Sequence, residues 1–134
     1  MRVVVDTNII VSGYLGGALK AIITAWKTGK FTLIVSKEIA EEYLKVLRRP
    51  KFQIEPEEID DFAALLLQKA EFATPREAIH VIDADPTDNK FLEAAVAGKA
   101  KLIVSGDGHL LEIKTFKGIE IVTAREFITR LQNQ

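Results

Sequence analysis

The sequence predicts a three-layer α/β/α sandwich with a mostly parallel central sheet. Short apolar runs that are typical of buried strands alternate along the chain with amphipathic helical segments. This alternation indicates a parallel sheet that is covered by helices on both faces. The chain has 134 residues, of which 48% are hydrophobic and 28% are charged, so we expect a single globular domain over residues 1–134.

The first half of the chain is expected to form two strands and three helices. They are a strand from Arg2 to Val5, a helix from about Ala18 to Thr28, a strand from Phe31 to Val35, a helix from Ser36 to about Arg49, and a helix from about Pro56 to Ala70. A Gly16-Gly17 turn precedes the first helix. Ser36 is a favourable N-cap for the second helix, and Pro50 ends it.

The second half is expected to form three strands and two helices. They are a strand from Ile79 to Ile82, a helix opened by Asp85-Pro86-Thr87-Asp88 that extends to about Ala97, strands from Lys101 to Ser105 and from Ile119 to Val122, and a C-terminal helix. Thr123 and Glu126 are spaced as a capping box for that last helix. His80 falls inside an expected strand and His109 at the start of a short helical turn, so we interpret both histidines as structural.

The composition excludes several kinds of site. The chain has no cysteine, which excludes disulfides, thiolate zinc sites and a cysteine nucleophile. No apolar run approaches the ~20 residues of a membrane-spanning helix, and the first residues lack the pattern of a secretory signal, so we expect a cytoplasmic protein without a membrane contact.

The net charge of −1 gives no overall attraction to a polyanion. A nucleic-acid partner would have to be attracted by local cations or by bound metal ions. Arg48, Arg49 and Lys51 either contact phosphate or stabilise the C-terminus of their helix.

Acidic residues follow three of the expected strands. Asp6 comes directly after the first strand, Asp83 and Asp85 come after the strand that ends at Ile82, and Asp107 comes after the strand that ends at Ser105. Ligands of open parallel sheets bind at the carboxyl ends of the strands, at a topological switch point. We therefore expect these carboxylates to share one edge of the sheet.

Asp88 lies on a predicted helix rather than at a strand end. In helical projection it falls near the middle of an apolar stripe that includes Phe91, Leu92 and Ala95. A carboxylate that faces the core needs a cation or hydrogen-bond donors. The alternative is a helix-capping arrangement with Asp85, and both roles can coexist.

Glu42 is the better inward-facing acid of its helix by a small margin. Glu41 is placed to form a surface pair with Lys45 four residues later. Glu42 lies at the edge of the apolar face, beside Ile39 and Val46. Carboxylates clustered without cysteine favour hard cations such as Mg²⁺ or Mn²⁺, which can activate water for phosphodiester hydrolysis.

Four acidic segments resemble, in order and spacing, the motifs of the PIN-domain family, and specifically the VapC-like toxins of toxin–antitoxin systems. The segments are Val4-Val5-Asp6-Thr7-Asn8, Glu41 to Phe52, Asp85-Pro86-Thr87-Asp88-Asn89-Lys90-Phe91-Leu92, and Ile103-Val104-Ser105-Gly106-Asp107. The resemblance covers nearly the whole chain. It assigns the family's conserved glutamate to Glu42.

The resemblance implies a Mg²⁺- or Mn²⁺-dependent ribonuclease that cleaves single-stranded RNA, often as a homodimer, with an antitoxin protein as partner. The metal-binding and catalytic residues that it implies are Asp6, Glu42, Asp88 and Asp107, and the supporting residues are Asn8, Asp85 and Ser105. Two other functions stay open. Asp6 could be the nucleophile of a phosphatase or phosphotransfer domain, although the chain lacks the second aspartate of an Asp-x-Asp pattern. The fold could also serve as a catalytically silent binding module.

Overall fold

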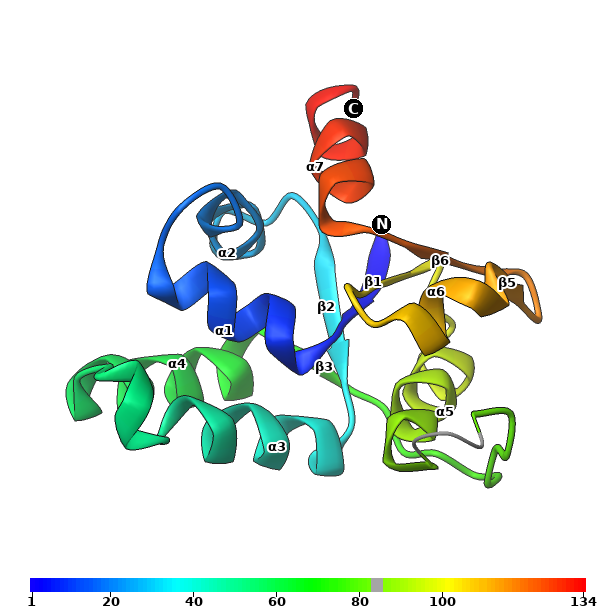
Figure 1. Cartoon of the computed structure of the whole chain (residues 1–134), viewed down its shortest axis with the longest axis horizontal. Helices are drawn as coiled ribbons and strands as arrows, with labels where there is room; N and C mark the ends of the chain where they lie inside the picture. The colour runs from blue at the N-terminus through cyan, green and yellow to red at the C-terminus, as the bar shows by residue number, and fades with distance from the viewer. Residues whose placement is uncertain (83–85) are drawn as a thin grey trace.

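The protein, described by a computed structural model for residues 1–82 and 86–134, is built around a sheet with the strand order β3-β2-β1-β4-β6-β5 (Figure 1). The strands are β1 (Arg2–Val5), β2 (Thr32–Val35), β3 (Glu71–Phe72), β4 (Leu102–Val104), β5 (Thr115–Phe116) and β6 (Ile119–Val122). All the pairings are parallel except that of β5 with β6. The predicted mostly parallel sheet is confirmed.

Helices cover both faces of this sheet. They are α1 (Thr7–Leu15), α2 (Lys20–Lys27), α3 (Lys37–Leu47), α4 (Pro56–Lys69), α5 (Asn89–Ala97), α6 (Gly108–Ile113) and α7 (Ala124–Gln132), with short 3₁₀ turns η1 (Pro50–Phe52) and η2 (Pro86–Asp88). Figure 1 shows α1 to α4 on one side of β2, and α5 and α6 on the other. The α/β/α arrangement that the alternating pattern predicts is therefore correct.

The two helix starts that the sequence predicted from capping residues are confirmed. The Ser36 hydroxyl accepts a hydrogen bond from the backbone N–H of Ile39 at 3.2 Å, and α3 begins at the next residue. The Thr123 hydroxyl accepts from the backbone N–H of Glu126 at 3.1 Å at the start of α7. Each side chain satisfies an amide that has no partner inside its helix.

The predicted strand from Ile79 to Ile82 is wrong. The side-chain oxygen of Asn89 accepts from the backbone N–H groups of Val81 and Ile82 at 3.1 and 2.9 Å. The N–H of Ile79 donates to the carboxylate of Glu93 at 2.9 Å. These amides are therefore unavailable to a sheet, and the edge strand on that side is β3. His80 is exposed rather than in a strand or the core.

Helix α1 was not predicted because its apolar residues do not recur with the period of an amphipathic helix. Ile9, Ile10 and Val11 are consecutive and all buried, so they show neither the periodicity of an amphipathic helix nor that of a half-exposed strand. Taken singly, no described helix is long and apolar enough to span a membrane; α1 and α2 pass that test only as a pair, which is bent by 98°.

The chain reverses its direction of travel across the sheet at β1. From β1 it proceeds to β2 and then β3, and it next crosses over to β4 on the opposite side of β1. The carboxyl ends of β1 and β4 therefore flank the topological switch point, where α/β proteins place their ligands. Asp6 follows β1, and Ser105 and Asp107 follow β4.

The close packing of α5 on the sheet can be tested at Gly98, which ends that helix. A Cβ atom at Gly98 would lie 2.5 Å from Cγ2 of Ile34, a fully buried residue of β2, and 3.1 Å from the carbonyl oxygen of Ala94. We expect Gly98→Ala to lower the free energy of unfolding by about 1–3 kcal/mol, because the sheet or the helix must shift. Urea denaturation measures the change.

The matched control is Gly108→Ala, where a Cβ atom meets nothing within 4 Å. This variant should unfold at nearly the urea concentration of the wild type. Equal losses in the two variants would show that the tight contact with Ile34 is not the cause.

Candidate functional site

Two aspartates from neighbouring strands are joined by one buried hydroxyl. The Oγ of Ser105 donates to Oδ2 of Asp6 at 2.7 Å and accepts from the backbone N–H of Asp107 at 2.9 Å. The N–H of Asp6 donates to the carbonyl oxygen of Val104 at 2.9 Å, so the β1–β4 pairing continues up to the first carboxylate. The structure thus brings Asp6, Ser105 and Asp107 together at the switch point.

Both aspartates also begin helices. Oδ1 of Asp6 accepts from the backbone N–H of Asn8 at 3.4 Å at the start of α1, and Oδ1 of Asp107 accepts from that of His109 at 2.7 Å at the start of α6. His109 is therefore a helix-entry residue, as predicted. Asn8 supports Asp6 through its backbone amide, while its side chain is exposed.

The surroundings of Asp6 oppose its negative charge. Burial raises the pKa of its carboxyl, and the charges of Asp107 and Glu42 raise it further. The hydrogen bonds from Ser105 and from the Asn8 amide act in the opposite direction, but the net pKa stays above the ordinary value. A carboxylate that is buried beside two other acids is stabilised by a bound cation.

Glu42 reaches the site from α3. The neighbouring Tyr43 is fully buried and its hydroxyl donates to the carbonyl oxygen of Val5, the residue before Asp6. This contact fixes α3 against the end of β1. Oε2 of Glu42 accepts from the hydroxyl of Thr7, the residue after Asp6. The inward orientation predicted for Glu42 is therefore confirmed.

The predicted surface pair of Glu41 has a different partner. Glu41 is exposed as expected, but its carboxylate lies 4.0 Å from the ammonium of Lys37, one turn earlier, rather than pairing with Lys45. Both lysines are four residues from Glu41, so spacing alone could not choose between them.

Lys90 is a buried cation beside these acids. Its Nζ lies 2.8 Å from Oε1 of Glu42 and donates to the carbonyl oxygen of Thr87 at 2.7 Å. The Lys90 side chain is 6% exposed and that of Glu42 is 32% exposed. This ion pair connects α3 to the start of α5.

Asp88 is two residues before Lys90 in the chain. It is the last residue of η2 and the N-cap residue of α5, and it is half-buried. The next residue, Asn89, is buried and binds the chain on both sides of the turn: its amide nitrogen donates to the carbonyl oxygens of Ile82 and Pro86 at 3.2 and 3.0 Å. Asp83 and Asp85, which the sequence also placed near the site, lie outside the described residues.

The acids do not form a compact metal cage. Within residues 1–82 and 86–134, no three Asp, Glu or His side chains converge closely enough to hold a metal ion by themselves. The donor set nevertheless fits Mg²⁺ or Mn²⁺. Mg²⁺ in proteins typically keeps several waters and is bound by one or two carboxylates together with substrate phosphates. Asp6 and Asp107 provide such a pair of hard oxygen ligands.

Four residues of this site were not singled out from the sequence. They are Thr7, Tyr43, Asn89 and Lys90. Thr7, Tyr43 and Lys90 contact distant segments, whereas Asn89 binds the nearby amides of Val81 and Ile82. Helical phase gave a local signal for two of them. Tyr43 falls on the apolar face of its helix, and Lys90 stands one turn before Ala94, on the inner face of α5.

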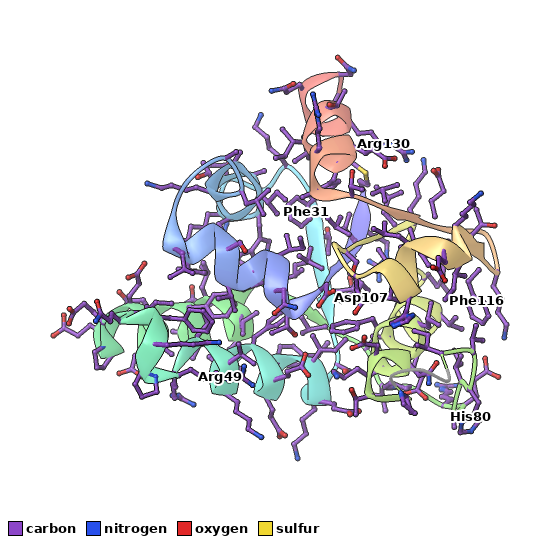
Figure 2. All side chains as sticks on the ribbon, viewed as in Figure 1. Phe31, Arg49, His80, Asp107, Phe116 and Arg130 are labelled. Carbon is purple, nitrogen blue, oxygen red and sulfur yellow. The ribbon has the colours of Figure 1, made fainter. Side chains whose placement is uncertain are left out.

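Arg49 and His80 lie away from Asp107. Figure 2 shows Asp107 near the centre of the molecule, whereas Arg49 and His80 lie toward its rim. Arg49 follows the C-terminal end of α3, while Glu42 is nearer the middle of that helix. The arrangement agrees with a structural role of Arg49 at the helix end.

Comparisons with known proteins identify the fold. A family model described as PIN domain matches residues 2–109. The chain is also similar to the crystal structure of PAE2754 from Pyrobaculum aerophilum, with a TM-score of 0.66, 14% sequence identity, and coverage of 100% of this chain and 91% of that one. No significant match was found among curated proteins.

The raised pKa of Asp6 predicts how pH affects stability in the absence of metal. The folded protein binds this proton more tightly than the unfolded chain, whose Asp pKa is about 3.9. Ionised Asp6 therefore destabilises the fold above its raised pKa, and this loss is relieved as the pH falls through that pKa. In EDTA, Asp6→Asn should be more stable than the wild type at pH 7, and its advantage should shrink toward pH ~4.

Urea denaturation at a series of pH values measures this difference. Asn is as good an N-cap as Asp, so the start of α1 is preserved in the variant. The control, Asp60→Asn, changes an exposed aspartate of α4 and should follow the wild-type curve. If Asp6→Asn is less stable than the wild type at pH 7, the charge of Asp6 does not destabilise the fold.

Proposed function

The chain belongs to the PIN domain family, whose members are generally nucleases, and on that premise we propose that it is a Mg²⁺- or Mn²⁺-dependent ribonuclease that cleaves single-stranded RNA. The observation that carries the proposal is the Asp6–Ser105–Asp107 arrangement at the switch point of the sheet. In this arrangement, a buried carboxylate whose pKa is raised lies beside a second carboxylate. Among the described ion pairs, none brings a lysine or arginine to either aspartate.

Asp6 and Asp107 would hold the metal, with Glu42 and Asp88 as the further acids of the site. When bound, a divalent cation supplies Lewis acidity toward the phosphodiester and neutralises charge that develops on its oxygens. The protein's own residues have other tasks. Ser105 orients Asp6, Thr7 orients Glu42, and Tyr43 keeps α3 against the end of β1. An overall charge of −1 makes the metal the main attraction for an RNA backbone.

The toxin assignment is a further part of the proposal. It rests on the resemblance of the acidic motifs to those of VapC-like proteins. An antitoxin that blocks the acidic edge and a homodimeric assembly are the partners that this assignment implies. A small DNA-binding-type protein encoded directly upstream would support it.

The proposed activity predicts a graded loss of RNA cleavage. Purified protein should cleave a mixed-sequence single-stranded RNA with Mn²⁺ or Mg²⁺ and not with EDTA. Asp6→Asn and Asp107→Asn should each reduce the rate at least about a hundredfold, and Ser105→Ala about 10–100-fold, because Ser105 orients a ligand without being one. Gel analysis of labelled RNA gives the rates.

Asp60→Asn serves as the control and should cleave at the wild-type rate. Cleavage that persists in Asp6→Asn protein or in EDTA would contradict the proposal and point to a contaminating nuclease. Formation of an acyl-phosphate on Asp6 would favour the phosphotransfer function instead.

Metal binding should also stabilise the fold, because a cation relieves the repulsion between the carboxylates. At about 100 times the Kd, Mn²⁺ should raise the melting temperature by roughly 5–15 °C. The double variant Asp6→Asn/Asp107→Asn should not respond. A wild-type melting temperature that is indifferent to millimolar Mn²⁺ would contradict a preformed site.

A further inference from the structure

The ammonium of Lys90 is held in one place beside the Glu42 carboxylate. Its Nζ contacts Oε1 of Glu42 at 2.8 Å and the carbonyl oxygen of Thr87 at 2.7 Å, and it lies 5.0 Å from the ring centroid of Phe91. The side chain is 6% exposed. Lysine is among the side chains that proteins bury least often, and it is usually paired where it is buried.

Stability alone does not account for this pair. Removing two charges from water costs about as much as their attraction returns, so apolar side chains of similar volume are often as good or better. An apolar residue at position 90 would also suit the fully buried neighbours Phe91 and Ala94. The charge of the ammonium beside the Glu42 carboxylate is the feature that an apolar residue would not reproduce.

The two halves of the site differ in how their carboxylates are held. Glu42 pairs with the Lys90 ammonium and accepts the Thr7 hydroxyl. Asp6 and Asp107 are held instead by the Ser105 hydroxyl and by backbone amides, and no lysine or arginine in the described chain forms an ion pair with either. One half of the site therefore already contains a cation, and the other contains none.

We infer that Lys90 is a positioning residue that takes the place of one metal ion, so that the protein binds a single divalent cation per chain in the absence of RNA, on the side of Asp6 and Asp107. The inference rests on the proposed function. Among the described residues, the four acids of the site carry four negative charges when they are ionised. Lys90 neutralises one of these charges, and one divalent cation neutralises two. A second divalent cation beside a fixed ammonium would give the site an excess of positive charge, and like charges in a buried site repel strongly.

The charge balance predicts that removal of the ammonium admits a second metal ion. Lys90→Met keeps most of the side-chain length and removes the charge. Titration calorimetry with Mn²⁺ alone should give one ion per chain for the wild type and two for Lys90→Met. Without metal, the variant should melt about 5–10 °C below the wild type, because Glu42 has lost its partner, and Mn²⁺ should raise its melting temperature more than that of the wild type.

Two further variants separate this role from a structural one. Lys37→Met removes a lysine from the exposed pair with Glu41 and should keep one ion per chain. Glu42→Gln/Lys90→Met removes both charges of the buried pair and should also keep one ion, because the second ligand is gone. A purely structural lysine would change the melting temperature but not the number of ions bound.

The outcomes distinguish this inference from the proposed function. One ion per chain in both wild type and Lys90→Met, with similar affinity, would overturn the inference and leave the metal-dependent activity standing. Two ions per chain in the wild type would also overturn the inference and leave the metal-dependent activity standing. No Mn²⁺ binding in any variant would overturn both. A Lys90→Met protein that stays unfolded in millimolar Mn²⁺ would overturn the inference, because the metal would then have failed to replace the ammonium.

Discussion

The Ser105 hydroxyl between Asp6 and Asp107 is the interaction on which the arrangement of the site depends. A hydroxyl has one proton and two lone pairs; here the proton is donated to Asp6, and a lone pair accepts the N–H of Asp107. Ser105 is fully buried, and its own N–H donates to the carbonyl oxygen of Val122 at 3.0 Å. The two aspartates therefore keep their relative position because β1, β4 and β6 are neighbours in the sheet.

The same burial that fixes Asp6 also destabilises its charge. Desolvation and the nearby acids raise its pKa, while the helix cap and the Ser105 hydrogen bond compensate only in part. If the residue at this position had only a structural role, a neutral side chain would give a more stable fold. Ionised Asp6 thus lowers the stability of the fold, which is typical of functional sites where a bound ligand neutralises the charge.

Local patterns in the sequence predicted β1, β2, β4 and β6, most helix boundaries, and the meeting of Asp6 with Asp107. They missed β3 and β5, which are two residues long each, and the role of Ser105 came from the family resemblance. The strand over Ile79 to Ile82 was wrongly predicted because its amides bind Asn89, which is distant enough to escape any strand pattern. Thr7 and Tyr43 were missed for a related reason. Their hydroxyls bind groups 35 and 38 residues away, and no spacing rule reveals such contacts.

The Glu42–Lys90 pair explains how the remaining acids are placed, since neither lies at a strand end. Helix α3 covers one face of the sheet and α5 the other, so this pair joins the two helical layers across the carboxyl edge of the strands (Figure 1). Asp88 is two residues before Lys90 and is the N-cap residue of α5, the helix that carries the lysine of this pair. The Ser105 bridge, in contrast, connects groups at the ends of β1 and β4 and involves neither Glu42 nor Lys90. Asp6 and Asp107 are therefore positioned by the sheet, whereas Glu42 is positioned by an ion pair between helices.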